Sequence, residues 1–235
     1  MRLRLRPPPI LLLFVAASLA CEGRTSGLLV SGPVAGVRVR LLNALTSSQS
    51  LSFVVDAQVA SAGVGFGAAS PYVPLTLGSH RLQAQVSTTG TTLVDFTRDL
   101  TSQGSFSLIP APGLAQFGAL FIPDDPTVPA GQAKIRVVHV AAAPGPVSVY
   151  VTSATADLSS ATPTIPTLAF GAASGYATVT PGTYRVRITP AGVPSTVLLD
   201  SGSLTLGSGS VRTLLLTDAP GGGLPTTLSV ISDAN

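Results

Sequence analysis

The chain has 235 residues, of which 45% are hydrophobic and only 10% are charged, with 24 glycines and 20 prolines. This composition excludes the highly charged, weakly hydrophobic profile of a disordered protein, and it suits short strands joined by Gly/Pro turns. The pI of about 9.5 does not indicate a nucleic-acid partner. Removal of residues 1–20 takes three of the thirteen basic residues and no acidic ones, which leaves ten of each, and these ten are spread along the chain rather than clustered.

The N-terminus is typical of an export signal. Arg2, Arg4 and Arg6 form a positive region, three prolines follow, and residues 10–17 are an apolar run. That run is too short to span a bilayer, which needs roughly 20 residues, but it has the length of the hydrophobic region of a signal peptide. We therefore expect residues 1–20 to be a signal peptide.

The end of this signal, Ser18-Leu19-Ala20-Cys21, resembles the lipobox of bacterial lipoproteins, although the usual leucine three places before the cysteine is Ser18 here. The resemblance implies that Cys21 carries acyl chains, and two such chains are enough for firm membrane anchoring. The alternative is cleavage by ordinary signal peptidase, with Cys21 an incidental thiol. Because Cys21 is the only cysteine, it cannot form an internal disulfide. We expect an exported, lipid-anchored protein of the bacterial cell envelope, with residues 21–35 as a tether.

One stretch occurs twice, Phe-Gly-Ala-Ala-Ser-Pro-Tyr at 66–72 and Phe-Gly-Ala-Ala-Ser-Gly-Tyr at 170–176, with a spacing of 104 residues. We call these two stretches the first and second motif. Because internal repeats outrank other sequence signals, they predict two copies of one unit. The copies are placed at 36–122 and 133–235. Between them, residues 123–132 contain three prolines and form a stiff linker.

Short alternating segments follow the same order in both copies. Val37, Val39 and Leu41 alternate with two arginines, which predicts a half-buried strand. A polar loop separates it from the next apolar segment, 51–55, so we expect an antiparallel hairpin. The other predicted strands are 78–86, 93–98, 105–109 and 115–122 in the first copy, and 134–139, 147–151, 182–188, 196–199, 211–216 and 227–231 in the second. We predict an all-β fold of two tandem immunoglobulin-like antiparallel β-sandwich domains.

The two copies differ by eight extra residues in the second, within the Ser/Thr/Ala/Pro-rich segment 152–167. A tolerated surface insertion and a binding loop are both consistent with this segment, because loops accept extra length readily. Asp157 is its candidate binding residue. We expect any binding specificity to lie in residues that the two copies do not share.

The second copy resembles a known family. Residues 135–139, a Pro-containing turn, residues 147–151 and the run 181–187 resemble bacterial domain-of-unknown-function family 4397. The resemblance covers roughly residues 36–232 and implies an exported β-sandwich module, often lipid-anchored and commonly in tandem. It implies no activity and no catalytic residues. Ser148 and Thr152 stand where the family has acidic residues, and only Asp56 keeps such a position, which argues against a cation site.

Chemistry-bearing residues are sparse. Neither histidine is repeated, and His139 continues the alternation of a strand, so we interpret it as a partly buried structural residue. The carboxylates stand singly except for Asp124-Asp125 in the linker, which we expect to be solvated or to cap a turn. No nucleophile elbow, Cys/His metal cluster or calcium-loop motif occurs in the sequence. We predict no catalytic residues, no metal site and no cofactor.

Tyr72 and Tyr176 occupy equivalent places in the two motifs. One hypothesis makes them aromatic platforms on a binding surface, and the other makes them structural tyrosines packed beneath a loop. The sequence as a whole favours a non-enzymatic structural or adhesion-type protein. The alternatives are a glycan- or peptide-binding accessory protein, with an envelope protein or glycan as partner, and more remotely an envelope hydrolase.

Overall fold

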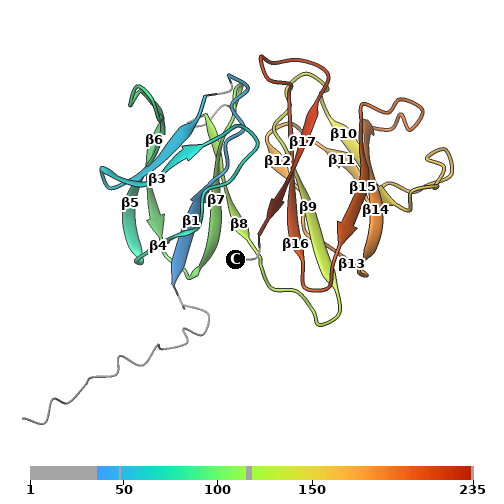
Figure 1. Ribbon diagram of the computed structural model, residues 1–235, viewed down its shortest axis with the longest axis horizontal. Coiled ribbons are helices and arrows are strands. Elements are labelled where there is room, and N and C mark those ends of the chain that lie inside the picture. The colour runs from blue at the N-terminus through green and yellow to red at the C-terminus, as the bar shows by residue number, and fades with distance from the viewer. Residues whose placement is uncertain (1–35, 48, 115–117, 234–235) are drawn as a thin grey trace, which may run out of the picture. The chain divides into compact units, whose positions relative to one another are not determined.

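The computed structural model describes residues 36–47, 49–114 and 118–233, and these lie in one compact unit, Ala35–Asn235. The predicted signal peptide, Cys21 and the tether lie outside the described residues. All regular elements of the described part are strands, which confirms the all-β prediction (Figure 1). None of the described residues belongs to a helix long and apolar enough to cross a membrane.

The strands fall into two halves, residues 36–124 and 133–233. The first half contains β1 (Val37–Leu41), β2 (Leu51–Val55), β3 (Gln58–Val64), β4 (Val73–Leu75), β5 (Gly78–Val86), β6 (Thr92–Leu100), β7 (Gly104–Pro110) and β8 (Ala119–Asp124). The second half contains β9 (Ala133–His139), β10 (Val147–Thr152), β11 (Ile165–Leu168), β12 (Ala172–Ala173), β13 (Ala177–Val179), β14 (Gly182–Pro190), β15 (Leu199–Leu206), β16 (Val211–Thr217) and β17 (Thr227–Ser232).

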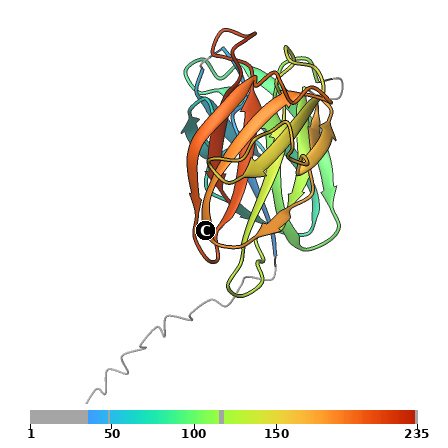
Figure 2. The ribbon, with the colours of Figure 1, turned by 90° about the vertical axis from the view of Figure 1, so that its right-hand side faces the viewer.

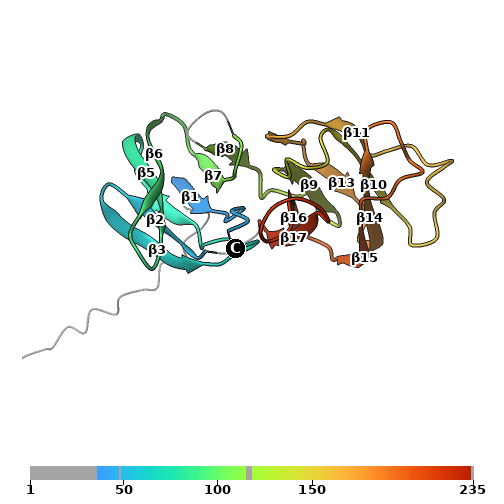
Figure 3. The same cartoon turned by 90° about the horizontal axis from the view of Figure 1, so that it is seen from above.

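Each half is a sandwich of two sheets. In the first half, a sheet of order β4-β1-β7-β8 faces a sheet of order β3-β2-β5-β6; in the second, β12-β9-β16-β17, with β13 also on β9, faces β11-β10-β14-β15. Seen from above, the two layers of each sandwich are distinct (Figure 3), and Figure 2 shows the second half in front. We call the sheets that contain β1 and β9 the junction sheets.

The pairing within each junction sheet corrects one expectation. The expected hairpin between residues 37–41 and 51–55 does not form, because β1 pairs with β4 and β7 while β2 belongs to the opposite sheet. The segment between them crosses from one layer to the other. In addition, β1 runs parallel to β7, and β9 runs parallel to β16, so each sandwich contains one parallel pair among its antiparallel ladders.

β2 pairs with β5 and with β3, a strand that the sequence does not signal. Asp56 and Ala57 form the two-residue turn between β2 and β3, at φ values of 48° and 65°. Turns of this kind need positive φ and usually contain glycine or asparagine, so neither residue here marks a turn strongly. β3 itself is rich in small residues and carries register irregularities against β2.

The apolar core has three parts. Two clusters fill the sandwiches, one with Phe53, Leu82 and Leu108 at its centre and the other with Val149, Ile188 and Leu214. The third cluster joins the halves, with buried side chains from both junction sheets: Leu42, Ala44, Ile109, Ala111, Val138, Val140, Leu215 and Ile231. Because these side chains leave water only when the halves meet, the third cluster favours their association.

His139, at the end of β9, is fully buried. Its Nε2 atom donates to the carbonyl of Gly145 over 2.7 Å, and its Nδ1 atom has no hydrogen-bond partner among the described residues. The ring edge meets Phe170 of the second motif, with centroids 6.3 Å apart. Burial lowers the pKa of His139 below its ordinary 6.5, while the Gly145 bond and the Asp218 carboxylate oppose this effect. The imidazole is therefore held neutral in the folded chain.

This burial predicts an acid-sensitive contribution to stability. The unfolded chain takes up a proton on His139 near pH 6.5, whereas the folded chain does so only at lower pH, so the free energy of unfolding falls as pH drops below 6.5. Urea titrations between pH 7 and 5.5 should show this loss. In His139→Gln, which keeps an N–H donor for Gly145, the slope should be flatter, and an unchanged slope would contradict a buried neutral imidazole.

Candidate functional site: the junction between the halves

The junction begins with the alternation of β1 and β9. In β1, Val39 and Leu41 point into the core of the first sandwich, so Arg40 points out of its other face. In β9, Ile135 and Val137 do the same for the second sandwich, and Arg136 points outward. Both arginines are nonetheless buried, at 2% and 3% exposure, because the junction sheets cover one another.

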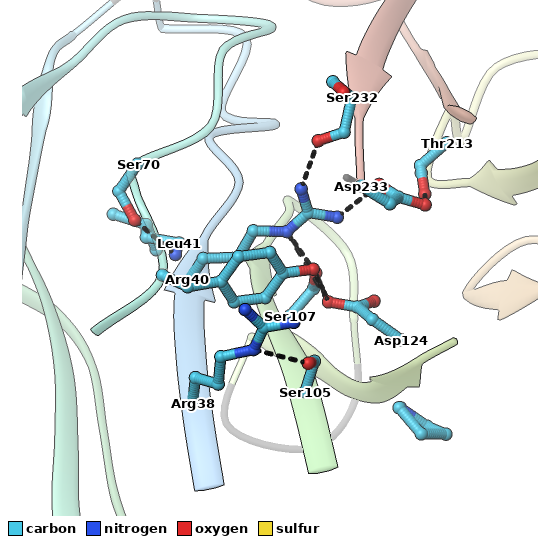
Figure 4. Close-up of polar contacts among 12 residues, drawn as sticks. Arg38, Arg40, Leu41, Ser70, Ser105, Ser107, Asp124, Thr213, Ser232 and Asp233 are labelled. Carbon is cyan, nitrogen blue, oxygen red and sulfur yellow. Dashed lines mark hydrogen bonds and ion pairs between the residues drawn. The ribbon is translucent and has the colours of Figure 1, made fainter. Parts of the chain in front are cut away.

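The guanidinium of Arg40 donates a hydrogen bond from each of its three nitrogens. Its Nε donates to Ser107 Oγ at 2.9 Å, one terminal nitrogen donates to the carbonyl of Ser232 at 2.8 Å, and the other donates to Asp233 Oδ1 at 2.5 Å. Ser107 belongs to the same half as Arg40, whereas Ser232 and Asp233 belong to the other half (Figure 4).

Arg136 repeats this arrangement from the opposite side. Its Nε donates to Thr213 Oγ1 at 2.8 Å, and a terminal nitrogen donates to the carbonyl of Pro123 at 2.8 Å. Its other terminal nitrogen forms an ion pair with Asp124. Each arginine therefore uses a hydroxyl of its own half and a carbonyl and carboxylate of the other, which is an exchanged, pseudo-two-fold pair of ion pairs.

The two aspartates occupy equivalent places at the ends of β8 and β17. Asp124 accepts hydrogen bonds from Tyr72 Oη and Ser107 Oγ, both at 2.7 Å. Asp233 accepts from Tyr176 Oη at 2.7 Å and from Thr213 Oγ1 at 2.6 Å. Each buried carboxylate thus has an arginine of the other half and two hydroxyls of its own half, and Asp124 Oδ2 also lies 3.5 Å from Arg40 Nε of its own half.

The tyrosine rings complete the network. The guanidinium carbon of Arg40 lies 4.6 Å from the centre of the Tyr72 ring, and that of Arg136 lies 4.7 Å from the Tyr176 ring, which is cation–π geometry. Burial raises the pKa of both tyrosines, and the neighbouring carboxylates raise it further against the opposing effect of the arginines. Both phenols therefore stay protonated and act as donors.

The formal charges of the junction residues cancel. Two arginines face two carboxylates, so the buried set carries no net formal charge. Burial alone would lower the pKa of Arg40, but the Asp124 and Asp233 carboxylates beside it raise it above its ordinary value. Burial of ions costs several kcal/mol each, and good geometry with further hydrogen bonds is needed to offset it. The junction network supplies both the good geometry and the further hydrogen bonds.

The two motifs hold the junction together. Ser70 and Ser174 accept hydrogen bonds from the backbone of the opening strands, at Leu41 and Val137, over 2.9 and 3.0 Å. Gly67, at φ 71°, lies so close to β17 that a Cβ there would stand 2.3 Å from Ser229 Oγ. The first motif therefore packs against the edge strand of the other half, and its positive φ together with this close approach favours glycine at position 67.

The candidate binding residues predicted from the sequence lie in different parts of the structure. Tyr72 and Tyr176 come together in the junction, half-buried, with their hydroxyls on buried carboxylates. Asp157 lies apart in the 152–167 segment, where it accepts hydrogen bonds from the amide and hydroxyl of Ser159. Those bonds lower its pKa. Cys21 lies outside the described residues.

Sequence reasoning missed the charged members of the junction. Arg40 and Arg136 were expected on the wet face of half-buried strands, and Asp124 was expected to be solvated or to cap a turn, but all three are buried. Asp125 does cap a turn, at Thr127, and also pairs with Lys134. The available signal was the recurrence of arginine at the same place in both opening strands.

A second polar cluster resembles a catalytic triad, but its hydrogen bonds are better explained as closing a turn. His80 Nδ1 lies 2.7 Å from Asp56 Oδ2, and its Nε2 lies 3.1 Å from the Thr76 carbonyl and 3.3 Å from the Thr76 hydroxyl. At the equivalent place in the second half, Tyr184 donates to the carbonyl of Thr180 over 2.7 Å. Because a tyrosine makes the same bond, closing the turn is the shared role. Across the described ranges, no three His, Cys, Asp or Glu side chains are arranged to hold a metal ion.

The comparisons with known proteins give one family. The model of Domain of unknown function (DUF4397) matches residues 37–150, which are the first half and the opening of the second, up to β10. No curated protein matches the chain. Among solved structures, the chain is similar to a family 26 carbohydrate-binding module from Eubacterium rectale Amy13K, crystallised with maltoheptaose. The sequence identity is 9%, the TM-score is 0.26, and the match covers 82% of this chain and 95% of that one.

The junction predicts a large cost for removing one partner. Arg40→Met leaves Asp233 buried without its cation, and we expect the free energy of unfolding to fall by about 3–5 kcal/mol. The matched control is Arg81→Met, since Arg81 pairs with Asp95 at 2.5 Å on the surface, with 54% and 37% of these side chains exposed. That change should cost at most about 1 kcal/mol. Urea titration measures both, and equal losses would contradict a special role for the junction.

Proposed function

We propose that the chain is a non-enzymatic structural module of the cell envelope, because residues 37–150 match the model of DUF4397, a domain family of unknown function, and the chain folds as two sandwiches joined by a buried ionic network. In this proposal the two halves act as one rigid block, and acyl chains on Cys21 hold the block at a membrane surface. No reaction is assigned to it.

The observation that supports this proposal is how the junction uses its polar groups. Arg40, Arg136, Asp124 and Asp233 are all buried, and each pairs with the other half. In an open site these side chains could take part in acid–base chemistry. Here their charged groups pair across the junction and hold the two halves in register. A network of this kind fixes one relative arrangement, since any shift would leave buried charges without partners.

A rigid pair of sandwiches suits a spacer or adhesion-type role. A flexible pair would separate its ends by a variable distance, whereas a block with a continuous apolar and ionic junction presents its surface loops at a fixed distance from its attachment. The tether, residues 21–35, would connect this block to the membrane. The support for anchoring is the sequence alone: the charged start, the short apolar run and the lone cysteine that follows it.

Substitution of the cysteine tests the anchored part of the proposal. In Cys21→Ser the acylation site is lost, so we expect the protein to move from the membrane fraction to the soluble fraction and to stop incorporating labelled palmitate. Cell fractionation with immunoblotting measures this. Ser26→Ala, in the same tether, is the matched control and should stay with the membrane. A Cys21→Ser protein that remains in the membrane fraction would sink the anchoring proposal.

A further inference from the structure

The outer face of the β10–β14–β15 sheet carries a buried arginine. Val149 and Ile188 point into the core of the second sandwich, so their strand neighbours Tyr150 and Arg187 point out of the opposite face. Both are nonetheless buried, at 3% and 9% exposure. The chain between β10 and β11 lies on this side of the sheet, away from β9 and β16 (Figure 3). We call its residues 153–163 the cover segment.

Two arginines of β14 hold the cover segment to the sheet. One terminal nitrogen of Arg187, Nη2, donates to Thr152 Oγ1 at 2.7 Å and to the carbonyl of Ala156 at 2.8 Å. Nη1 of Arg185 donates to the carbonyl of Ala154 at 3.2 Å. Among the described residues, the backbone–backbone hydrogen bonds of the cover segment all lie within it. Its backbone is therefore attached to the sheet through these arginine side chains rather than through a strand ladder.

The guanidinium of Arg187 has no carboxylate partner. No carboxylate of the described residues lies within ion-pair distance of it. Its Nε atom is buried and has no hydrogen-bond partner in the described part of the chain. Nε and Nη2 lie on one edge of the planar guanidinium, so half of this edge bonds to neutral oxygens and the other half bonds to nothing. A buried donor without an acceptor is costly.

Two other arginines show what this edge is suited to bind. Arg81 donates from Nε and Nη2 to the two carboxylate oxygens of Asp95, at 2.8 and 2.5 Å. Arg185 grips Asp200 in the same way, with Nε to Oδ1 at 2.7 Å and Nη2 to Oδ2 at 2.6 Å. Such two-point pairs match the planar fork to the planar carboxylate. Arg187 presents the same edge without the carboxylate.

The first half has no counterpart of this arginine. Gln83 stands at the equivalent place, 104 residues earlier, and it faces Asp95 across the sheet as Arg187 faces Asp200. The amide of Gln83 donates to Asp95 Oδ2 at 3.1 Å and needs no counter-ion. The charge of Arg187 and the eight extra residues of the 152–167 segment are therefore found together, and only in the second half.

The neighbouring carboxylates are engaged elsewhere. Asp200 is held by Arg185 and by the amide of Gly202. Asp157, in the cover segment, is exposed and accepts hydrogen bonds from the amide and hydroxyl of Ser159. These bonds chiefly lower the pKa of Asp157, and the charge of Arg187 adds to the effect. Both aspartates thus act on Arg187 at a distance, and neither fills its free edge.

We propose that Arg187 is the receptor for the carboxylate of a small ligand and that residues 153–163 cover this site. The ligand carboxylate accepts from Nε and Nη2 together and replaces the Thr152 hydroxyl and the Ala156 carbonyl on Nη2, so the cover segment is released from the sheet. The exchange is favourable because a charged, two-point acceptor replaces neutral oxygens and satisfies the buried Nε. The site lies outside the junction and does not depend on the acylation of Cys21.

Side-chain NMR of the ¹⁵N-labelled full chain tests the binding step, with sodium acetate as the probe and sodium chloride at equal ionic strength as the control. We expect the Nε–H signal of Arg187, assigned by its loss in Arg187→Lys, to shift with acetate and to reach saturation, and to stay in place with chloride. The Nε–H signal of Arg81, which already bonds to a carboxylate, should shift with neither salt. Absence of a saturable acetate shift at Arg187 would overturn the proposal.

Hydrogen exchange followed by mass spectrometry tests the release of the cover segment. Acetate should speed exchange of residues 153–163 in the native chain, because their attachment through Arg187 is lost. In Arg187→Lys, which keeps the charge but not the two-point edge, acetate should no longer change this exchange, whereas in the matched control Arg81→Lys the acetate effect should remain. Thermal melts confirm that both variants are folded. Unchanged exchange in the native chain, or an equal acetate effect in both variants, would contradict the proposal.

Discussion

The structure depends on the exchange of two buried ion pairs. Arg40 of the first half bonds to Asp233 of the second, and Arg136 of the second bonds to Asp124 of the first. Each arginine bonds directly to a carboxylate of the other half, and Arg40 Nε also lies 3.5 Å from Asp124 Oδ2 of its own half. Hydrophobic contact between the junction sheets supplies a non-directional attraction, whereas the ion pairs fix the register. The duplicated motifs extend this constraint, since their tyrosines donate to the same carboxylates.

This constraint separates what the two halves share from what they do not. The shared parts, which are the opening strands, the motifs and the terminal aspartates, form the junction and its supports. One unshared part is the surface segment 152–167 of the second half. A duplicated scaffold can change such surfaces in one copy without disturbing the junction. Binding specificity, where it exists, is therefore expected there rather than at Tyr72 or Tyr176.

Sequence reasoning reaches the strands but not their partners. The bounds of β1, β2 and β5 follow directly from alternation, since a strand with one apolar face repeats every second residue. The crossing between β1 and β2 does not follow, because a polar loop joins two strands of one sheet as readily as two strands of opposite sheets. β3 was missed because its turn contains Asp56 and Ala57 instead of glycine. Asp124 was placed in a solvated linker because burial of a carboxylate depends on a partner that only the tertiary structure brings near.

The junction makes the two sandwiches one cooperative unit. Differential scanning calorimetry of the full chain tests it most directly, because independent halves and a coupled pair differ in the ratio of the calorimetric to the van 't Hoff enthalpy. The account predicts a single transition with a ratio of about one. Two separable transitions, or one transition with a ratio of about two, would show that the halves unfold independently and would contradict it.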